Sequence, residues 1–145
     1  MAHSSSSISS ERGWFATIDK PTVHAGHKLS AIPTGAFVLQ LEPAGSVSFE
    51  LPPERKPKGE TWFGGTVSLP APAMGGIYQI TISDDAWIDI VQEHNFVRSA
   101  GSTGRSDCTG LRKSVRLDLR ALPFVLQFSG AVVPVITLSV SPAAK

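Results

Sequence analysis

Short stretches in which apolar and polar residues alternate are the feature that most limits the fold of this chain. Residues 77–83 show the pattern best, because Tyr78, Ile80 and Ile82 share one face and the stretch is rich in β-branched and aromatic residues. No apolar pattern at helical spacing is sustained anywhere in the sequence. Glycine or proline interrupts every window in which a helix would start. The sequence therefore predicts an all-β chain with no substantial helix.

Strand-like stretches recur along the chain with turns between them. We predict strands at residues 36–42, 46–51, 64–69, 77–83, 87–92, 96–99, 113–119, 124–128 and 135–140. Residues 36–42 and 46–51 are expected to form one hairpin, and 77–83 and 87–92 another. Residues 93–95 are expected to turn the chain into the strand that follows. Together these stretches predict a two-sheet antiparallel sandwich or jelly roll of about eight to ten short strands.

The 145 residues suit one domain, which we place at residues 12–141. Residues 1–11 are small and polar, without the charged and apolar regions of a signal peptide, and are expected to be a flexible leader. Residues 142–145 are expected to be a tail.

Charge and cysteine content limit the partners and the redox setting. Thirteen basic and 12 acidic residues leave a net charge of +1, so nucleic acid is not expected as a partner. No apolar stretch in the sequence is long enough to span a membrane. Cys108 is the single cysteine, which rules out a disulfide within the chain. That fits a reducing cytosol and does not exclude the periplasm.

Four segments, residues 76–80, 87–91, 103–108 and 123–127, resemble a known group of proteins. The group consists of small exported bacterial proteins whose β-sandwich is like that of pre-peptidase C-terminal and carbohydrate-binding modules. The resemblance covers roughly residues 30–140. Some of the group carry the automatic name homogentisate 1,2-dioxygenase, an enzyme that binds iron through two histidines and one carboxylate, and this sequence shows no convincing version of that set. The resemblance implies the fold and an origin in the bacterial envelope, and no activity.

Residues 102–113 are predicted to form a loop with the most concentrated chemistry in the chain. Arg105 and Arg112 would suit an anion, because a guanidinium matches a carboxylate or phosphate in a fork. The same cations would favour a thiolate at Cys108, which would then be a nucleophile. The alternative is an ordered loop in which Asp107 pairs with an arginine and Cys108 is a small buried residue.

Two further groups raise the question of a metal. His24 and His27 lie three apart, a spacing that could share a metal on a helix, but Gly26 and nearby prolines favour a surface loop. Asp84, Asp85 and Asp89 could bind calcium or act as paired carboxylates, although the first two also suit a tight turn. The sequence leaves open whether either group binds metal, and we assign neither a metal nor a cofactor.

Flat aromatic faces could form a platform for sugars, with Trp14, Trp62, Trp87 and Tyr78 as candidates. Trp62 is the preferred one, because it follows a charged loop and precedes two glycines.

We expect a non-catalytic binding or interaction module of the bacterial envelope, periplasmic or secreted. Its expected ligand is a glycan, a small anion or a partner protein, reached through loops at one end of the sandwich. The alternatives are a small metal- or thiol-dependent enzyme, and self-association through an exposed strand edge at residues 135–140. The expected contact residues are Trp62, Arg105, Asp107, Cys108 and Arg112.

Overall fold

The computed structural model describes residues 20–33, 35–53, 57, 59, 61–84, 86–97, 99–108 and 111–142. For residues 99–108 and 111–113 it describes the course of the backbone alone. The expected leader at residues 1–11, Trp14 and Asp85 lie outside the described residues.

The larger sheet has six strands, and every neighbouring pair in it is antiparallel except the outermost, in which β1 runs parallel to β2. In spatial order the strands are β1 (Thr22–His24), β2 (Ala36–Gln40), β11 (Val135–Pro142), β5 (Gly76–Ile82), β9 (Leu111–Leu119) and β8 (Ser99–Cys108).

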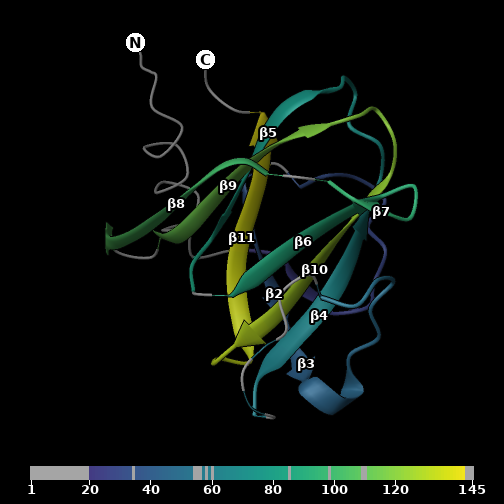
Figure 1. Cartoon of the computed structure of the whole chain (residues 1–145). Coiled ribbons are helices and arrows are strands. Elements are labelled where there is room, and N and C mark those ends of the chain that lie inside the picture. Colours follow the sequence, from purple (N-terminus) through teal and green to yellow (C-terminus); the bar gives the residue numbers. More distant parts are fainter. Residues whose placement is uncertain are drawn as a thin grey trace.

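The smaller sheet has five antiparallel strands packed face to face with the first sheet (Figure 1). In spatial order they are β3 (Glu42–Pro43), β4 (Phe63–Leu69), β10 (Phe124–Ala131), β6 (Trp87–Gln92) and β7 (Asn95–Phe96). In the described part of the chain the one helical element is the three-residue 3-10 helix η1 (Ala44–Ser46).

The strand order is that of a jelly roll. From β2 to β6 and again from β9 to β11, successive long strands change sheet. Strand β11 is inserted between β2 and β5, and β10 is inserted between β4 and β6. The predicted all-β, two-sheet sandwich is confirmed. The described residues hold eleven strands, one above the predicted range, because β1, β3 and β7 are only two or three residues long.

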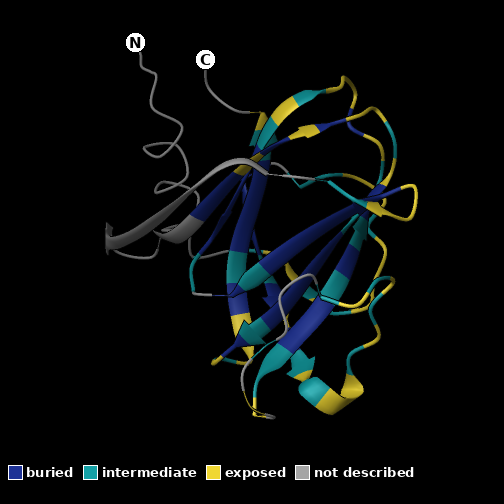
Figure 2. Cartoon of the chain, in the orientation of Figure 1, coloured by how far each residue is buried: buried dark blue, intermediate teal, exposed yellow. Residues whose placement is uncertain are grey.

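The inward-facing side chains of both sheets form one apolar core (Figure 2). Its largest fully buried members are Phe37 on β2 and Phe124 and Phe128 on β10. Ile80 and Ile82 on β5 face this core, as the alternation predicts.

The two predicted hairpins are wrong. Strand β5 belongs to the six-stranded sheet and β6 to the five-stranded sheet, so residues 77–83 and 87–92 face each other across the core. Residues 47–51 form no strand. They cross the outer face of the five-stranded sheet, where the side-chain oxygen of Gln127 accepts hydrogen bonds from the backbone N–H groups of Glu50 (2.9 Å) and Leu51 (3.2 Å).

Three other predictions change with the strand order. Residues 135–140 lie in β11, in the interior of the larger sheet, and are therefore not an exposed edge. Strand β11 continues to Pro142, which pairs with Tyr78, so Pro142 belongs to the sheet and not to the predicted tail at residues 142–145. The predicted loop at residues 102–113 is the hairpin of β8 and β9, which extends away from the body of the sandwich (Figure 1). Its edge strand needs only backbone pairing with β9, so it lacks an apolar alternation.

We predict that Phe128→Ala lowers the free energy of unfolding by about 3–5 kcal/mol, because it leaves a cavity in the centre of the core. Phe49→Ala is the matched comparison, since Phe49 is half-buried on the outside of the smaller sheet and should cost less than half as much. Urea denaturation of both variants measures the difference. Equal losses would contradict the assignment of the core.

Candidate functional site

The connections at one end of the sandwich bring together a group of charged side chains. Here the β6–β7 turn lies beside the connection from β9 to β10, and residues 50–51 approach across the smaller sheet (Figure 1). We call this group the end cluster, and it consists of Glu50, Glu93, His94 and Arg120.

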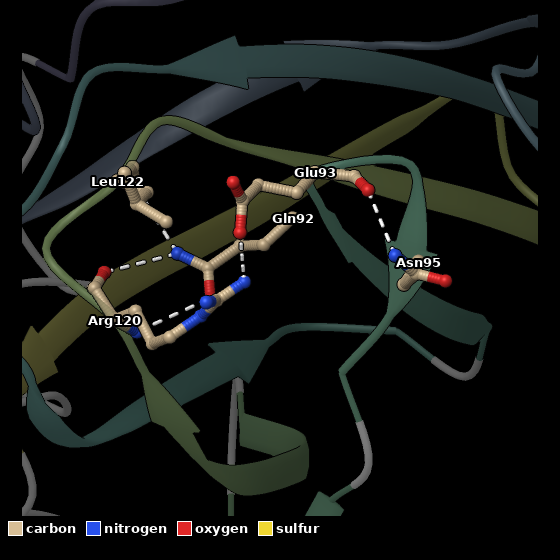
Figure 3. A network of polar contacts seen from close by, with 5 residues as sticks. All are labelled: Gln92, Glu93, Asn95, Arg120 and Leu122. Carbon is tan, nitrogen blue, oxygen red and sulfur yellow. Dashed lines mark hydrogen bonds and ion pairs between the residues drawn. The ribbon is translucent and has the colours of Figure 1, made fainter.

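Gln92 holds two of these segments together. It continues the inward row of Ile88 and Ile90 to the end of β6 and is 4% exposed. Its side-chain amide donates to the carbonyl oxygens of Arg120 (3.0 Å) and Leu122 (3.1 Å) and accepts from the backbone N–H of Arg120 (3.1 Å) (Figure 3). The amide thus satisfies backbone groups that have no strand beside them.

The β6–β7 turn has a backbone conformation that residues other than glycine rarely adopt. Gln92 pairs with Asn95, so the loop between them has two residues, Glu93 (φ +49°) and His94 (φ +63°). Positive φ at both positions defines a type I′ turn, whose preferred residues are Asn and Gly. The predicted tight turn at residues 93–95 is confirmed. Asn95 supports it, because its side-chain amide donates to the Glu93 carbonyl at 2.8 Å (Figure 3).

Both turn residues reach a charged partner on another segment. The Arg120 guanidinium donates to the Glu93 carboxylate, and both side chains are more than half exposed (Figure 3). His94 Nδ1 lies 2.8 Å from a carboxylate oxygen of Glu50, with the imidazole 86% exposed. The end cluster therefore presents two carboxylates, one guanidinium and one imidazole on the surface.

Gln127 fixes the position of Glu50. This side chain faces outward from β10, opposite to Leu126 and Phe128, yet it is 1% exposed beneath residues 50–51. Besides accepting from the two backbone N–H groups, it donates to the Leu51 carbonyl at 2.9 Å. A buried amide thus holds each half of the end cluster.

The β4–β5 connection borders the end cluster. Gly75 packs against the backbone of residues 119–121, so that a Cβ at this position would lie 3.2 Å from the Leu119 carbonyl oxygen. The neighbouring Met74 is 75% exposed, and its carbonyl accepts a hydrogen bond from the Tyr78 hydroxyl at 2.8 Å. An exposed apolar residue thus stands one position before the contact with the backbone of Arg120.

The predicted contact residues are divided between two places. Arg105, Asp107 and Cys108 lie on β8 and Arg112 on β9, so the backbone brings these four together in the outer half of one hairpin. Trp62 directly precedes β4 in the other sheet. The structure does not join Trp62 with the hairpin, and the side chains of the other four lie outside what it describes.

Trp62 is half-buried and stacks with Phe49, with ring centres 6.4 Å apart and planes tilted by 22°. A Cβ on Gly64 would lie 2.8 Å from the Trp62 ring and 2.4 Å from the Phe128 carbonyl oxygen, so glycine is required for this close approach. Trp62 therefore packs over the sheet and anchors the segment that crosses it.

The other aromatic candidates differ from Trp62 in their contacts. Trp87 is on the outer face of β6, where its indole N–H donates to Asp89 at 2.9 Å. Tyr78 packs against the core with its ring. Trp62, next to β4, and Trp87 thus both belong to the smaller sheet and Tyr78 to the larger one.

Asp84 and Asp89, the described carboxylates among the three predicted as a possible calcium site, have different surroundings. Asp84 accepts from the Ser83 hydroxyl at 2.9 Å, as suits a turn, and Asp89 is 3% exposed on β6. Within the described ranges, no group of three or more His, Cys, Asp or Glu is arranged to hold a metal ion.

The end cluster was missed from the sequence, although two signals point to it. Gln92 is a polar residue at an inward position of an apolar strand, which indicates a buried hydrogen-bonding role. Glu93 and His94 occupy a two-residue turn that favours Asn-Gly, and this departure indicates a requirement other than turn stability.

Comparisons of the chain with protein-family models, with curated proteins and with solved structures find no match. No helix in the described part of the chain has the length and apolar character needed to cross a membrane.

We predict that Gln92→Ala lowers the free energy of unfolding by about 2–3 kcal/mol, because three hydrogen bonds from a buried side-chain amide to the backbone are lost. Gln40→Ala is the matched control, since Gln40 is an exposed glutamine on β2 and should cost less than about 0.5 kcal/mol. Chemical denaturation compares the two. A loss for Gln92→Ala no larger than that of the control would show that the amide does not hold the two segments together.

Proposed function

We propose that this protein is a non-catalytic binding module of the bacterial envelope and that it binds a glycan at the end cluster. The observation that carries the proposal is the type I′ turn built from Glu93 and His94, whose exposed side chains reach Arg120 and Glu50. The resemblance of four segments to exported β-sandwich proteins supports the setting.

The contribution of this turn to stability does not explain its sequence. A non-glycine residue in the left-handed region costs about 1 kcal/mol, and two of them stand in this turn. An exposed ion pair typically contributes only about 0–1 kcal/mol to the free energy of unfolding. Asn-Gly would form the same turn without the strain. The presence of Glu and His is therefore better explained by a ligand than by folding.

The balance of charges favours a glycan over a small anion. Arg120 and His94 each already lie against a carboxylate, so an anion would meet a negative charge beside either basic side chain. Sugar hydroxyls both donate and accept, and they match carboxylates that accept and a guanidinium that donates. The exposed Met74 adds an apolar contact for the C–H face of a sugar ring.

The contacts favour binding over catalysis, because each carboxylate of the cluster already has a partner within it. Rigidity supports the same conclusion, since buried Gln92 and Gln127 fix the backbone on both sides and a fixed surface loses little entropy on binding. The alternative, a thiol-dependent enzyme, depends on the side chain of Cys108, which lies outside what the structure describes.

A glycan microarray of bacterial, plant and animal polysaccharides, followed by calorimetry of each hit, tests the proposal. We expect a hit whose Kd rises at least tenfold in Arg120→Ala, because the guanidinium is the donor of the cluster. Lys28→Ala, another exposed cation in a different loop, should bind as the parent does. An array without hits would contradict the proposal that the ligand is a glycan. Equal binding by Arg120→Ala and the parent would contradict the proposal that the glycan binds at the end cluster.

The double variant E93N/H94G tests the argument from strain. We predict a free energy of unfolding about 1 kcal/mol higher than the parent, because Asn and Gly adopt positive φ at lower cost. Glycan binding should weaken at the same time, as expected where stability and function compete. Glu93→Gln keeps the backbone requirement and removes the charge, so its stability should stay within about 0.5 kcal/mol of the parent. A destabilised double variant would show that the turn is selected for folding.

A further inference from the structure

Two exposed imidazoles lie together where the two sheets meet at one edge. His24 ends β1, and His27 follows in the turn after it. The ring centres are 6.0 Å apart and the ring planes are tilted by 45°. Neither ring belongs to the end cluster.

The turn that carries the rings is held on both sides. The backbone N–H of Ala25 donates to the Gln40 carbonyl on β2 at 2.9 Å, and that of Gly26 donates to the Thr66 carbonyl on β4 at 2.7 Å. The N–H of Ser68 donates to the His27 carbonyl at 3.1 Å. The positive φ of Gly26 (+92°) reverses the chain between the two histidines. The backbone therefore presents the imidazoles from fixed positions.

The separation of the rings fits a shared metal ion. A metal–nitrogen bond of about 2.0–2.1 Å places the ion about 3.2 Å from the centre of each ring, so rings that share an ion have centres at most about 6.4 Å apart. The observed 6.0 Å lies inside that limit. A tetrahedral ion requires ring centres about 5.2 Å apart, and a tetragonal ion such as Cu²⁺ requires about 6.4 Å for trans positions or about 4.5 Å for cis positions. Rotation of the two exposed side chains would bring the rings to the spacing of the bound ion.

We propose that His24 and His27 form a surface site for a divalent late transition metal, with water completing the coordination. Imidazole nitrogen suits Cu²⁺, Ni²⁺ and Zn²⁺, and among these Cu²⁺ is bound most tightly by a given nitrogen site. The Gln40 side chain, opposite His24 in the strand register, is exposed and neutral and so does not repel a cation.

Titration of the full chain with Cu²⁺ alone, followed by calorimetry and electron paramagnetic resonance, tests the site. All proteins carry His3→Ala, since His3 is a further imidazole in the sequence. We expect one Cu²⁺ per chain with two histidine nitrogens in the resonance spectrum. His24→Ala and His27→Ala should each weaken binding at least tenfold and leave one nitrogen. His94→Ala, an exposed histidine of the end cluster, should bind as the parent does.

Binding by His24→Ala and His27→Ala at the parent affinity would overturn the proposal, as would an equal loss in His94→Ala. Melting curves in the presence of a chelator provide the folding control, because both rings are exposed and their removal should leave the transition unchanged. A lower transition without metal, together with weaker binding, would mean that the histidines act through the turn, which also overturns direct ligation.

Discussion

Strands β5 and β6 follow one another in the chain but belong to different sheets, and their apolar faces therefore meet across the core instead of side by side. This arrangement brings the ends of strands from both sheets to the same end of the sandwich. Backbone groups at such an end have no ladder to join, and burial without a partner would cost about 1–3 kcal/mol for each group. Gln92 resolves this at the end of β6 by bonding three backbone groups of the β9–β10 connection.

Gln127 does the same for a different segment, and the two buried glutamines connect the fold to the candidate site. One holds the backbone of Arg120 and the other the backbone of Glu50, while the turn between them supplies Glu93 and His94. The exposed ion pairs contribute little to stability by themselves. The positions of the charged groups are thus set from beneath, by neutral amides in the low-dielectric interior, and a ligand would meet an arrangement that already exists.

The sequence reveals the strands better than their partners. Alternation identifies Ile80 and Ile82 as inward-facing, but an inward face is the same whether the next strand lies beside it or across the core, so the predicted hairpins failed. Alternation also predicted a strand at residues 46–51, where the backbone bonds instead to the side chain of Gln127. Residues of β8 were predicted to be part of a loop, because they have no apolar alternation. An edge strand that pairs through its backbone needs none.

The two proposed surfaces differ in the physical requirement that each meets. At the end cluster the acidic groups already lie against Arg120 and His94, so a ligand gains only by matching donors and acceptors that compensate one another, and a neutral polar molecule does this best. At the β1 turn the two imidazoles present nitrogen lone pairs from a backbone fixed to both sheets, and a metal ion gains from both at once. Positive φ supports each surface in a different way. Gly26 adopts a positive φ without strain. Glu93 and His94 adopt it at an energetic cost, and their side chains then lie at the tip of a turn.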